Sequence, residues 1–290
     1  MKLLSCIGML LLATAAQANT LAKMAETASV TLGVREASGA LSYMIGDGRY
    51  GGFHVELCQR VLADIQKARG WPKLEIKYQP LTSQNRFTLL RNGAVDIDCG
   101  STTHNKAREK EAAFALTTYV EEVRMAVRAD SGIQSIAQLA GRKVVTTVGT
   151  TSVQLMRRHE RAAGVGFKEV FGKDHAESFE LLESGRAAAF VMDVQVLAGL
   201  ITKTANPAAF RIVGEVLAVA PIAIMFRRDD APFKQAVDDS LREMMKSGEV
   251  ARIYDKWFVQ PIPPAGTRMG LPASAATKAA WAQPNDKAAD

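Results

Sequence analysis

Nine polar side chains, each placed just after a predicted strand, are the residues best suited to do chemistry. Three arginines and three hydroxyl residues fall in the first half of the chain, and a threonine, a histidine and an aspartate fall in the middle. They are Arg35, Ser83, Arg86, Ser101, Thr103, Arg108, Thr151, His175 and Asp193. In open α/β sheets, ligands bind outside the carboxyl ends of the strands. The set therefore predicts one binding site.

The charges of this set describe a ligand. Two or three cationic contacts, one acidic contact and the helix N-terminal amides near Thr151 suit a small molecule with two carboxylates and one ammonium. Glutamate and aspartate have this charge pattern. Taken singly, each residue has a simpler interpretation. An arginine after a strand is usually a surface charge, Thr150 or Asp193 could cap a helix, and His175 could lie in a turn.

These residues need a scaffold of alternating strands and helices, and the hydrophobic pattern indicates one. In the first half, strands and helices alternate at 30–34, 57–65, 74–78, 84–92, 95–99 and 104–112, with a glycine-rich turn at 46–52. In the middle they alternate at 143–148, 150–163, 168–171, 176–184, 187–192 and 194–204. Extended segments at 123–129 and 212–226 and a helix at 231–247 complete the pattern. It predicts two similar α/β units with open, mostly parallel sheets flanked by helices.

Composition and charge exclude several classes of protein. The chain has 290 residues, of which 48% are hydrophobic and 23% charged, so it is expected to be globular. The net charge is +6 and the bases are dispersed, and the densest basic cluster, 157–161, contains no aromatic residue. A nucleic-acid partner is therefore not expected. Cysteine and histidine spacings do not suit a metal site, and we expect neither a metal nor a cofactor.

The first 18 residues predict a secretory signal peptide. Lys2 precedes a short apolar stretch, and Ala16-Gln17-Ala18 suits a cleavage site, so we expect cleavage after Ala18 and export. Among the three cysteines, removal of Cys6 leaves Cys58 and Cys99. In an oxidising compartment these two form one disulfide or stay as two buried thiols.

Several short segments of the chain form a distinctive series. They are Thr82-Ser83-Gln84-Asn85-Arg86, Cys99-Gly100-Ser101-Thr102-Thr103, Gly149-Thr150-Thr151-Ser152, Lys173-Asp174-His175, Leu182-Glu183-Ser184-Gly185-Arg186-Ala187 and Asp255-Lys256-Trp257-Phe258. In this order and spacing the series resembles the periplasmic glutamate/aspartate-binding proteins of ABC importers, which belong to solute-binding protein family 3. The resemblance runs from about residue 29 to the terminal Pro284-Asn285-Asp286-Lys287-Ala288.

The resemblance implies a two-lobed type II periplasmic binding fold, in which two crossover strands form a hinge. Residues 19–122 and 218–262 would form lobe 1, residues 123–217 would form lobe 2, and 263–290 would be a C-terminal tail of little periodicity. It also implies a periplasmic monomer that captures L-glutamate or L-aspartate and delivers it to an inner-membrane ABC permease complex. Neither catalytic residues nor a cofactor is implied.

The resemblance also assigns a role to each site residue. Arg108, in the pattern that includes Ser101 and Thr103, would bind the ligand α-carboxylate with the Thr151 amide. Asp193, aided by Ser101, would accept the α-ammonium. The side-chain carboxylate would lie among the remaining four residues, which are Arg35, Ser83, Arg86 and His175.

The chain departs from the family pattern at three places. Val194 stands where a second acidic residue is expected after Asp193. The segment 218–225 is apolar and has no cysteine, which leaves Cys58 as a different partner for Cys99, and the tail at 266–283 is rich in alanine. Two alternatives stay open at this point. One is a binding protein for glutamine or asparagine, and the other is an enzyme on the same fold that resembles cyclohexadienyl dehydratases.

Overall fold

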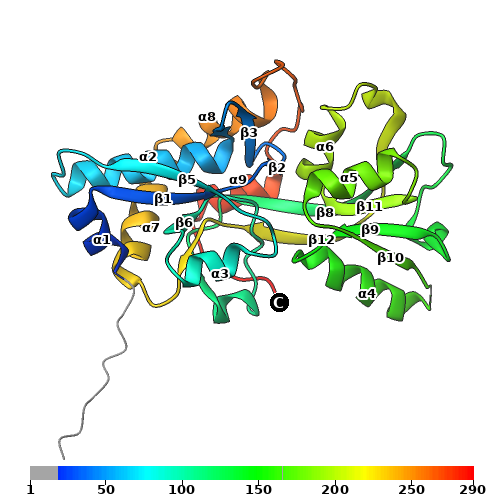
Figure 1. Cartoon of the computed structure of the whole chain (residues 1–290), viewed down its shortest axis with the longest axis horizontal. Coiled ribbons are helices and arrows are strands. Elements are labelled where there is room, and N and C mark those ends of the chain that lie inside the picture. The colour runs from blue at the N-terminus through cyan, green and yellow to red at the C-terminus, as the bar shows by residue number, and fades with distance from the viewer. Residues whose placement is uncertain (1–18, 165) are drawn as a thin grey trace, which may run out of the picture.

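The computed structural model describes residues 19–164 and 166–290. They form two α/β lobes that lie side by side and are joined by two long strands (Figure 1). The predicted signal peptide, residues 1–18, lies outside the described residues. Within the described ranges, no helix has both the length and the apolar character needed to cross a bilayer.

The first lobe is built on a five-stranded sheet in the order β5-β1-β6-β13-β7. Its strands are β1 (Ser29–Val34), β5 (Glu75–Pro80), β6 (Ile97–Asp98), β7 (Ala112–Phe114) and β13 (Met225–Arg227). β1 runs parallel to β5 and β6, whereas β13 runs antiparallel to β6 and β7. The helices of this lobe are α1 (Thr20–Thr27), α2 (Phe53–Ala68), α3 (Arg86–Arg91), α7 (Ala231–Lys246) and α8 (Glu249–Tyr254).

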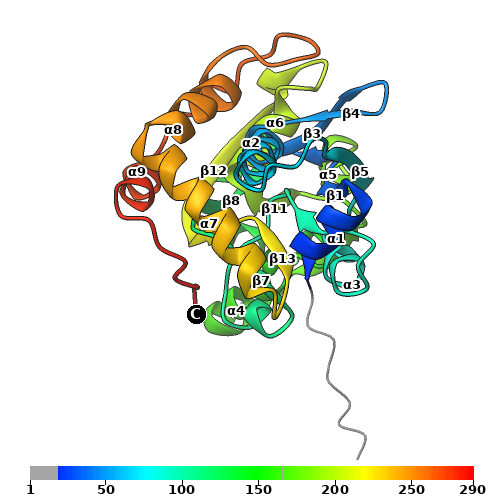
Figure 2. The same ribbon diagram turned by 90° about the vertical axis from the view of Figure 1, so that its left-hand side faces the viewer.

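Helices α2 and α7 pack against each other on this lobe, as the view from its outer end shows (Figure 2). Leu57, Val61 and Ile65 recur at helical spacing along α2, and all three are buried. A helix with one apolar stripe must cover that stripe, and the sheet and α7 supply the partner surface. The core of this lobe is therefore the layer between β1 and these helices.

The second lobe is also built on a five-stranded sheet, in the order β10-β9-β11-β8-β12. Its strands and helices are β9 (Lys143–Thr147), α4 (Thr151–Ala163), β10 (Lys168–Gly172), α5 (His175–Glu183), β11 (Ala189–Asp193) and α6 (Val194–Ile201). Every residue of β11 is buried, because apolar clusters pack on both faces of this sheet. The expected parallel pairing holds for β9 with β10 and β11, which alternate with helices.

Two long strands, β8 (Tyr119–Arg128) and β12 (Phe210–Ile222), connect the lobes. They pair antiparallel with each other, and the register shifts between Val213 and Ala218. β8 also pairs antiparallel with β11. Figure 1 shows both strands running from the first lobe into the second, which places the junction of the lobes along this pair.

The segment 104–112 is not the predicted helix. It contains only a 3₁₀ turn, η1 (Arg108–Lys110), followed by β7. The backbone of this segment is engaged elsewhere: Thr103 bridges Ile222, and the His104 N–H donates to the Pro221 carbonyl. Backbone groups that pair with another strand cannot form helical bonds, so tertiary contacts overrule the local polar pattern.

The glycine-rich turn expected at 46–52 belongs to a small three-stranded sheet. Its strands are β2 (Ala37–Ser38), β3 (Ser42–Gly46) and β4 (Arg49–Gly51), in the order β2-β3-β4. Further short helical turns complete the chain, and they are η2 (Ile136–Leu139), η3 (Pro207–Ala209) and η4 (Asp255–Val259).

The C-terminal tail contains a helix that its composition does not reveal, α9 (Ala275–Ala282). Thr277 is fully buried, and its hydroxyl accepts a hydrogen bond from the Val120 N–H at 3.1 Å. Trp281 Nε1 donates to the Thr118 carbonyl at 2.7 Å. Thr277 and Trp281 therefore dock this helix onto the start of β8, where the first lobe meets the connecting strands.

Candidate functional site

The predicted site residues converge between the two lobes. A small cavity is lined by Thr150, Met192 and eight of the nine predicted residues, namely Ser83, Arg86, Ser101, Thr103, Arg108, Thr151, His175 and Asp193. Arg35, the ninth, reaches the same place through a hydrogen bond from its Nη2 to Ser83 Oγ at 3.0 Å. The residues are thus assembled, while the ligand atom that each one contacts stays a prediction.

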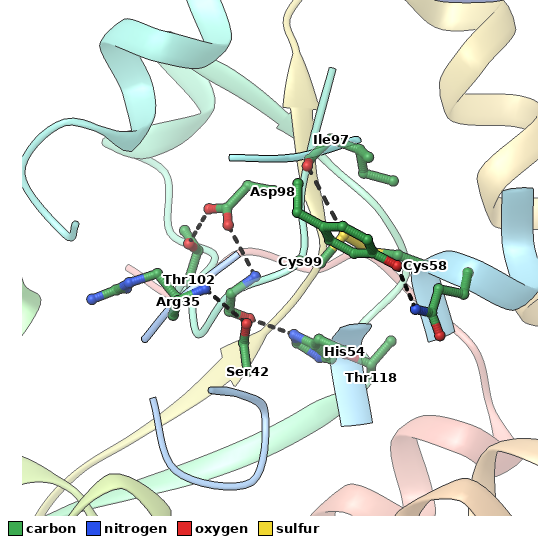
Figure 3. The surroundings of a disulfide bond; sticks show 12 residues. Arg35, Ser42, His54, Cys58, Ile97, Asp98, Cys99, Thr102 and Thr118 are labelled. Atoms are coloured by element: carbon green, nitrogen blue, oxygen red, sulfur yellow. Dashed lines mark hydrogen bonds between the residues drawn. A yellow bond between two sulfur atoms is a disulfide. The ribbon is translucent and has the colours of Figure 1, made fainter. Parts of the chain in front are cut away.

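Arg86 is held by a chain of hydrogen bonds that begins at the end of β6. Its Nη1 donates to Thr102 Oγ1 at 2.8 Å, and the Thr102 hydroxyl donates to Asp98 Oδ2 at 2.9 Å. Asp98 Oδ1 accepts the Gly100 N–H at 2.9 Å (Figure 3). The chain orients the guanidinium of Arg86, and Nε of Arg86 has no hydrogen-bond partner among the described residues.

A disulfide anchors the loop that carries Ser101 and Thr103. Cys58 of α2 and Cys99 are bonded, with their Cα atoms 6.3 Å apart (Figure 3). Of the two alternatives for these cysteines, the structure therefore contains the disulfide. His54, four residues before Cys58 on the same helix, contacts the Gly100 carbonyl through Nδ1. The loop is therefore attached to α2 both covalently and by a hydrogen bond.

The three arginines make the cavity strongly cationic. Arg35 and Arg86 are each 2% exposed, and Arg108 is 9% exposed. Burial, and then the neighbouring Arg86, lower the pKa of Arg35 to about 10 and the pKa of Arg108 to about 9. All three remain charged at neutral pH. Buried cations without enough counter-charge are unfavourable, so this cluster needs an anion.

Asp193 supplies the acid from the opposite lobe. It ends β11 and occupies the N-cap position of α6, yet its side chain makes no capping hydrogen bond. The side chain is 2% exposed. Burial raises the pKa of Asp193 to about 7, although Arg108, Arg86 and Arg35 act to lower it. The interpretation of Asp193 as a simple helix cap is therefore wrong, and its carboxyl group lines the cavity instead.

His175 joins the two lobes at the other end of the cavity. It begins α5, where Asp174 caps the helix, and its Nδ1 lies 2.9 Å from Thr147 Oγ1. Its Nε2 lies 3.4 Å from Arg35 Nη2. Because an arginine only donates, Nε2 acts as the acceptor and the ring is neutral. In agreement, burial and then Arg35 and Arg86 hold the pKa of His175 well below its usual value.

The start of α4 forms the remaining wall. Thr150 is the N-cap, but its hydroxyl donates back to the Thr147 carbonyl and makes no capping bond. The first amides of a helix have no partner within the helix, so those near Thr151 are available to an anion. The Gly149 carbonyl lies 3.4 Å from both Arg86 Nη2 and Arg108 Nη2, which links the two lobes across the cavity.

One buried acid near this site escaped the sequence reasoning. Glu121 on β8 is 1% exposed, and burial and the neighbouring Asp193 raise its pKa well above the usual value. Its signal is the two-residue period of the strand, because Tyr119, Glu121, Val123 and Met125 occupy the buried positions. Within the described residues, histidine, cysteine and carboxylate side chains do not gather in the groups of three or more that could hold a metal.

The chain is similar in sequence to proteins of a known family. Residues 30–260 match the family of bacterial extracellular solute-binding proteins, family 3. An L-glutamate/L-aspartate-binding protein of Pseudomonas aeruginosa is 40% identical over 272 residues, which cover 93% of this chain and 90% of that protein. A glutamate/aspartate import solute-binding protein of Escherichia coli K12 is 38% identical over 276 residues, which cover 95% of this chain and 91% of that protein.

The fold is likewise that of type II periplasmic binding proteins. A periplasmic binding protein from Brucella ovis, solved with glutathione bound, superposes with a TM-score of 0.73 at 26% identity, and covers 81% of this chain and 73% of that one. The matching family and the relatives named above are solute-binding proteins, so the enzyme alternative is set aside. A match over most of the sequence, a shared fold and a polar cavity between lobes agree: the chain belongs to the bacterial extracellular solute-binding proteins, family 3.

Proposed function

We propose that this protein captures L-glutamate or L-aspartate between its lobes and delivers it to an ABC importer. The observation that carries the proposal is the opposition of three buried arginines on one lobe to one buried aspartate on the other. An amino acid with a second carboxylate supplies two negative charges that pair with the arginines and one positive charge that pairs with the aspartate. The names of the relatives from Pseudomonas aeruginosa and Escherichia coli support the same ligands.

The ligand is proposed to lie along the cavity in one direction. Its α-carboxylate would contact Arg108 and the Thr151 amide, and its α-ammonium would contact Asp193 and Ser101. Its side-chain carboxylate would then face the partly unpaired cations at the other end. Arg35 Nη1 and Arg86 Nε support this direction, since neither atom has a hydrogen-bond partner among the described residues. Ser83, Thr103 and His175 complete the contacts.

This set of contacts is sufficient for tight and selective binding. Hydrogen bonds to charged groups contribute about 1.5–3 kcal/mol each. A micromolar dissociation constant requires only about 8 kcal/mol net, which four or five such contacts supply after ordering costs. Glutamine would leave Arg35 and Arg86 facing a neutral amide. We therefore expect a preference of at least about hundredfold for glutamate over glutamine.

The same proposal implies the oligomeric state, the location and the transport partner of the protein. It would act as a monomer in the periplasm after cleavage of the signal peptide following Ala18, and it would present its closed form to an inner-membrane permease complex. Lobe 1 would comprise residues 19–122 and 218–262, and lobe 2 would comprise residues 123–217. The tail at 263–290 would belong with lobe 1, because α9 docks on the start of β8.

Isothermal titration calorimetry on ligand-stripped protein tests the proposal. L-glutamate, L-aspartate and L-glutamine would be titrated into the wild type and into Arg86→Ala. We expect tight binding of the acidic amino acids, weak binding of glutamine, and a loss of at least about hundredfold in Arg86→Ala, because a buried ion pair is broken. Equal or tighter binding of glutamine by the wild type would contradict the proposal.

Arg91→Ala is the matched control. Arg91 ends the same helix, α3, but its side chain is 64% exposed and its nearest acid, Glu111, is 3.8 Å away. An exposed pair of this kind contributes little to stability or affinity. Its removal should leave all three titrations unchanged.

A further inference from the structure

The last residues of the chain lie against the loop that carries Arg108. Residues 284–290 follow α9 without forming a further helix (Figure 2). They lie outside the range 30–260, which matches the family. Ala289 nevertheless forms a parallel bridge with Asn105, three residues before Arg108. The end of the chain therefore borders the ligand site of the first lobe.

The two sides of this loop are held by different parts of the chain. On one side, Thr103 bridges β12, and the His104 N–H donates to the Pro221 carbonyl at 2.9 Å. On the other side, the Ala289 N–H donates to the His104 carbonyl, and the Ala289 carbonyl accepts the Lys106 N–H, both at 3.0 Å. β12 thus fixes the start of the loop, and Ala289 fixes its continuation.

Arg108 is bonded to this same loop through its backbone and its side chain. Its N–H donates to the Asn105 carbonyl at 3.0 Å and to Asn105 Oδ1 at 2.9 Å. Its Nη1 donates to the Thr103 carbonyl at 2.8 Å. A displacement of the loop would therefore displace the guanidinium that lines the cavity.

Further contacts fasten residues 285–290, here called the C-terminal strap, to the first lobe. The Thr117 N–H donates to the Asn285 carbonyl at 2.8 Å. Lys234 Nζ of α7 lies 3.0 Å from Asp286 Oδ2. The strap is thus anchored near its beginning as well as at Ala289, and it can hold the loop against the lobe.

We propose that the C-terminal strap is a positioning element of the ligand site: by pairing with Asn105 it holds the loop in which Arg108 is preformed to receive the α-carboxylate. The proposal rests on the proposed function, since it concerns the contact assigned to Arg108. A group that is already in place needs less ordering when the ligand binds, and the saving appears as affinity.

The charges in the cavity explain why Arg108 needs such support. Arg86 and Arg108 line the same cavity, and like charges repel each other. In the ligand-free protein this repulsion favours movement of Arg108 away from the cavity. Hydrogen bonds that hold its loop on both sides oppose that movement.

The test compares two proline substitutions at neighbouring positions of the strap. Ala289→Pro removes the N–H that bonds to the His104 carbonyl. Ala288→Pro is the matched control, because Ala288 is also half-buried and its N–H has no hydrogen-bond partner among the described residues. The dissociation constant for L-glutamate is measured by calorimetric titration for the wild type and each variant.

We expect Ala289→Pro to bind L-glutamate about tenfold more weakly, because Arg108 must then be ordered by the ligand. Ala288→Pro should stay within about twofold of the wild type, since it loses no hydrogen bond.

A double-mutant cycle separates positioning of Arg108 from a general loosening of the lobe. In the Arg108→Ala background, Ala289→Pro should weaken binding by less than about threefold, since the group to be positioned is gone. In the Arg86→Ala background its effect should remain about tenfold. A general structural role would weaken binding equally in both backgrounds.

Hydrogen exchange gives a second, independent measurement on the ligand-free protein. The amides of residues 105–108 should exchange at least about tenfold faster in Ala289→Pro than in the wild type, because a bonded edge of the loop is lost. Ala288→Pro should leave their exchange unchanged. This measurement decides the matter should Arg108→Ala bind too weakly to titrate.

Three results would overturn the inference: Ala289→Pro binding as tightly as Ala288→Pro, an equal loss in the two arginine backgrounds, or unchanged exchange at 105–108. The proposed function is judged separately, by the ligand preference of the wild type. If the wild type prefers another amino acid, the same variants are titrated with that ligand, which also carries an α-carboxylate.

Discussion

The two lobes contribute opposite charges to the cavity and hold them in different ways. On the first lobe, Arg86 is oriented by Thr102 and Asp98, and the adjoining loop is tied to α2 by the Cys58–Cys99 disulfide. On the second lobe, Asp193 makes no capping bond to its own helix. The cationic half is thus rigidly built by bonds within its own lobe, whereas the acidic group is left available.

The difference indicates when each half is used. Three buried arginines repel one another, and closing the second lobe over them without a ligand removes water from all three. The unliganded closed form is therefore disfavoured, and an anionic ligand that binds the cations favours closure. A preassembled cationic wall can hold the ligand first, after which Asp193 and His175 arrive with the second lobe. The predictions below test this division of roles.

The largest effect is expected from Asp193→Ala. Loss of the only predicted acidic contact leaves the ligand ammonium buried without a counter-charge, which costs about 3–5 kcal/mol and weakens binding more than about hundredfold. The ligand-free protein should lose no stability at pH 8, because Asp193 makes no capping bond and its burial as an anion is unfavourable. Calorimetric titration and urea unfolding measure the two quantities.

Asp230→Ala is the control, and we expect it to change stability rather than affinity, the reverse of Asp193→Ala. Asp230 caps α7 through the Phe233 N–H, and its Oδ2 accepts the Thr20 N–H at 2.8 Å. Its loss should lower the unfolding free energy by about 1–2 kcal/mol and leave the affinity unchanged. A variant of Asp193 that loses stability as much as Asp230→Ala, with its affinity intact, would show that Asp193 is a structural cap.

Removal of the disulfide tests the rigidity of the first lobe. The cysteines are 41 residues apart, and a cross-link that closes such a loop contributes about 4 kcal/mol in the chain-entropy description. We expect the double variant Cys58→Ala/Cys99→Ala to lose about 2–4 kcal/mol of unfolding free energy. Urea unfolding of the ligand-free protein gives this value. An unchanged unfolding free energy would mean that hydrogen bonds alone fix this lobe.

The convergence of the site residues was easier to predict from the sequence than the groups packed behind them. Residues after the parallel strands of one sheet converge because the strand ends share an edge, so Ser83, Arg86 and Ser101 could be grouped from the chain order alone. Glu121 could not, because β8 crosses between lobes and its register with β11 is a tertiary property. Its position in the buried phase of an alternating strand was the available signal.

Two elements of the fold were misjudged for a related reason. The polar segment 104–112 has a helical composition, but the Thr103 and His104 backbones pair with β12 and exclude a helix. In the tail, α9 has weak periodicity, and it is held by single contacts such as the Trp281 Nε1 bond to Thr118. In both segments, pairing with distant residues decides the structure, and a local pattern carries no information about it.

Gly149→Ala tests closure with a smaller expected effect. Gly149 has φ +78°, and a Cβ atom there would lie 2.6 Å from the Ser83 carbonyl oxygen of the opposite lobe. A clash of this kind costs about 1–3 kcal/mol in the closed form alone, so affinity should fall about tenfold. Calorimetric titration checks it.

Gly132→Ala is the matched control for closure. Gly132 has a similar φ of +69°, and a Cβ atom there meets no atom within 4 Å. It therefore carries the same backbone strain without the clash between lobes. If the two alanine variants lose equal affinity, strain and not closure is the cause.

The smallest predicted effect is a pH dependence that originates in the second lobe. The pKa of Asp193 is raised to about 7 by burial, and the carboxyl group must ionise to accept an ammonium. A proton is therefore released on binding below about pH 7, and affinity should weaken about fourfold between pH 8 and pH 6.5.

The groups that face Asp193 should not obscure this dependence. Arg108 has a pKa of about 9 and stays charged below pH 8, and burial and the neighbouring Asp193 raise the pKa of Glu121 well above its usual value. The lowered pKa of His175 keeps that ring neutral.

The pH dependence of stability in the ligand-free protein has the opposite sign to that of affinity. A raised carboxyl pKa contributes stability at low pH, and this stability is lost as pH rises from about 4 to 7. Titrations at pH 7 in buffers of different ionisation enthalpy should detect release of about half a proton, since Asp193 is then half ionised. If no proton is released, the ionisation of Asp193 does not accompany binding. The arginines of the first lobe are then the source of the electrostatic selectivity.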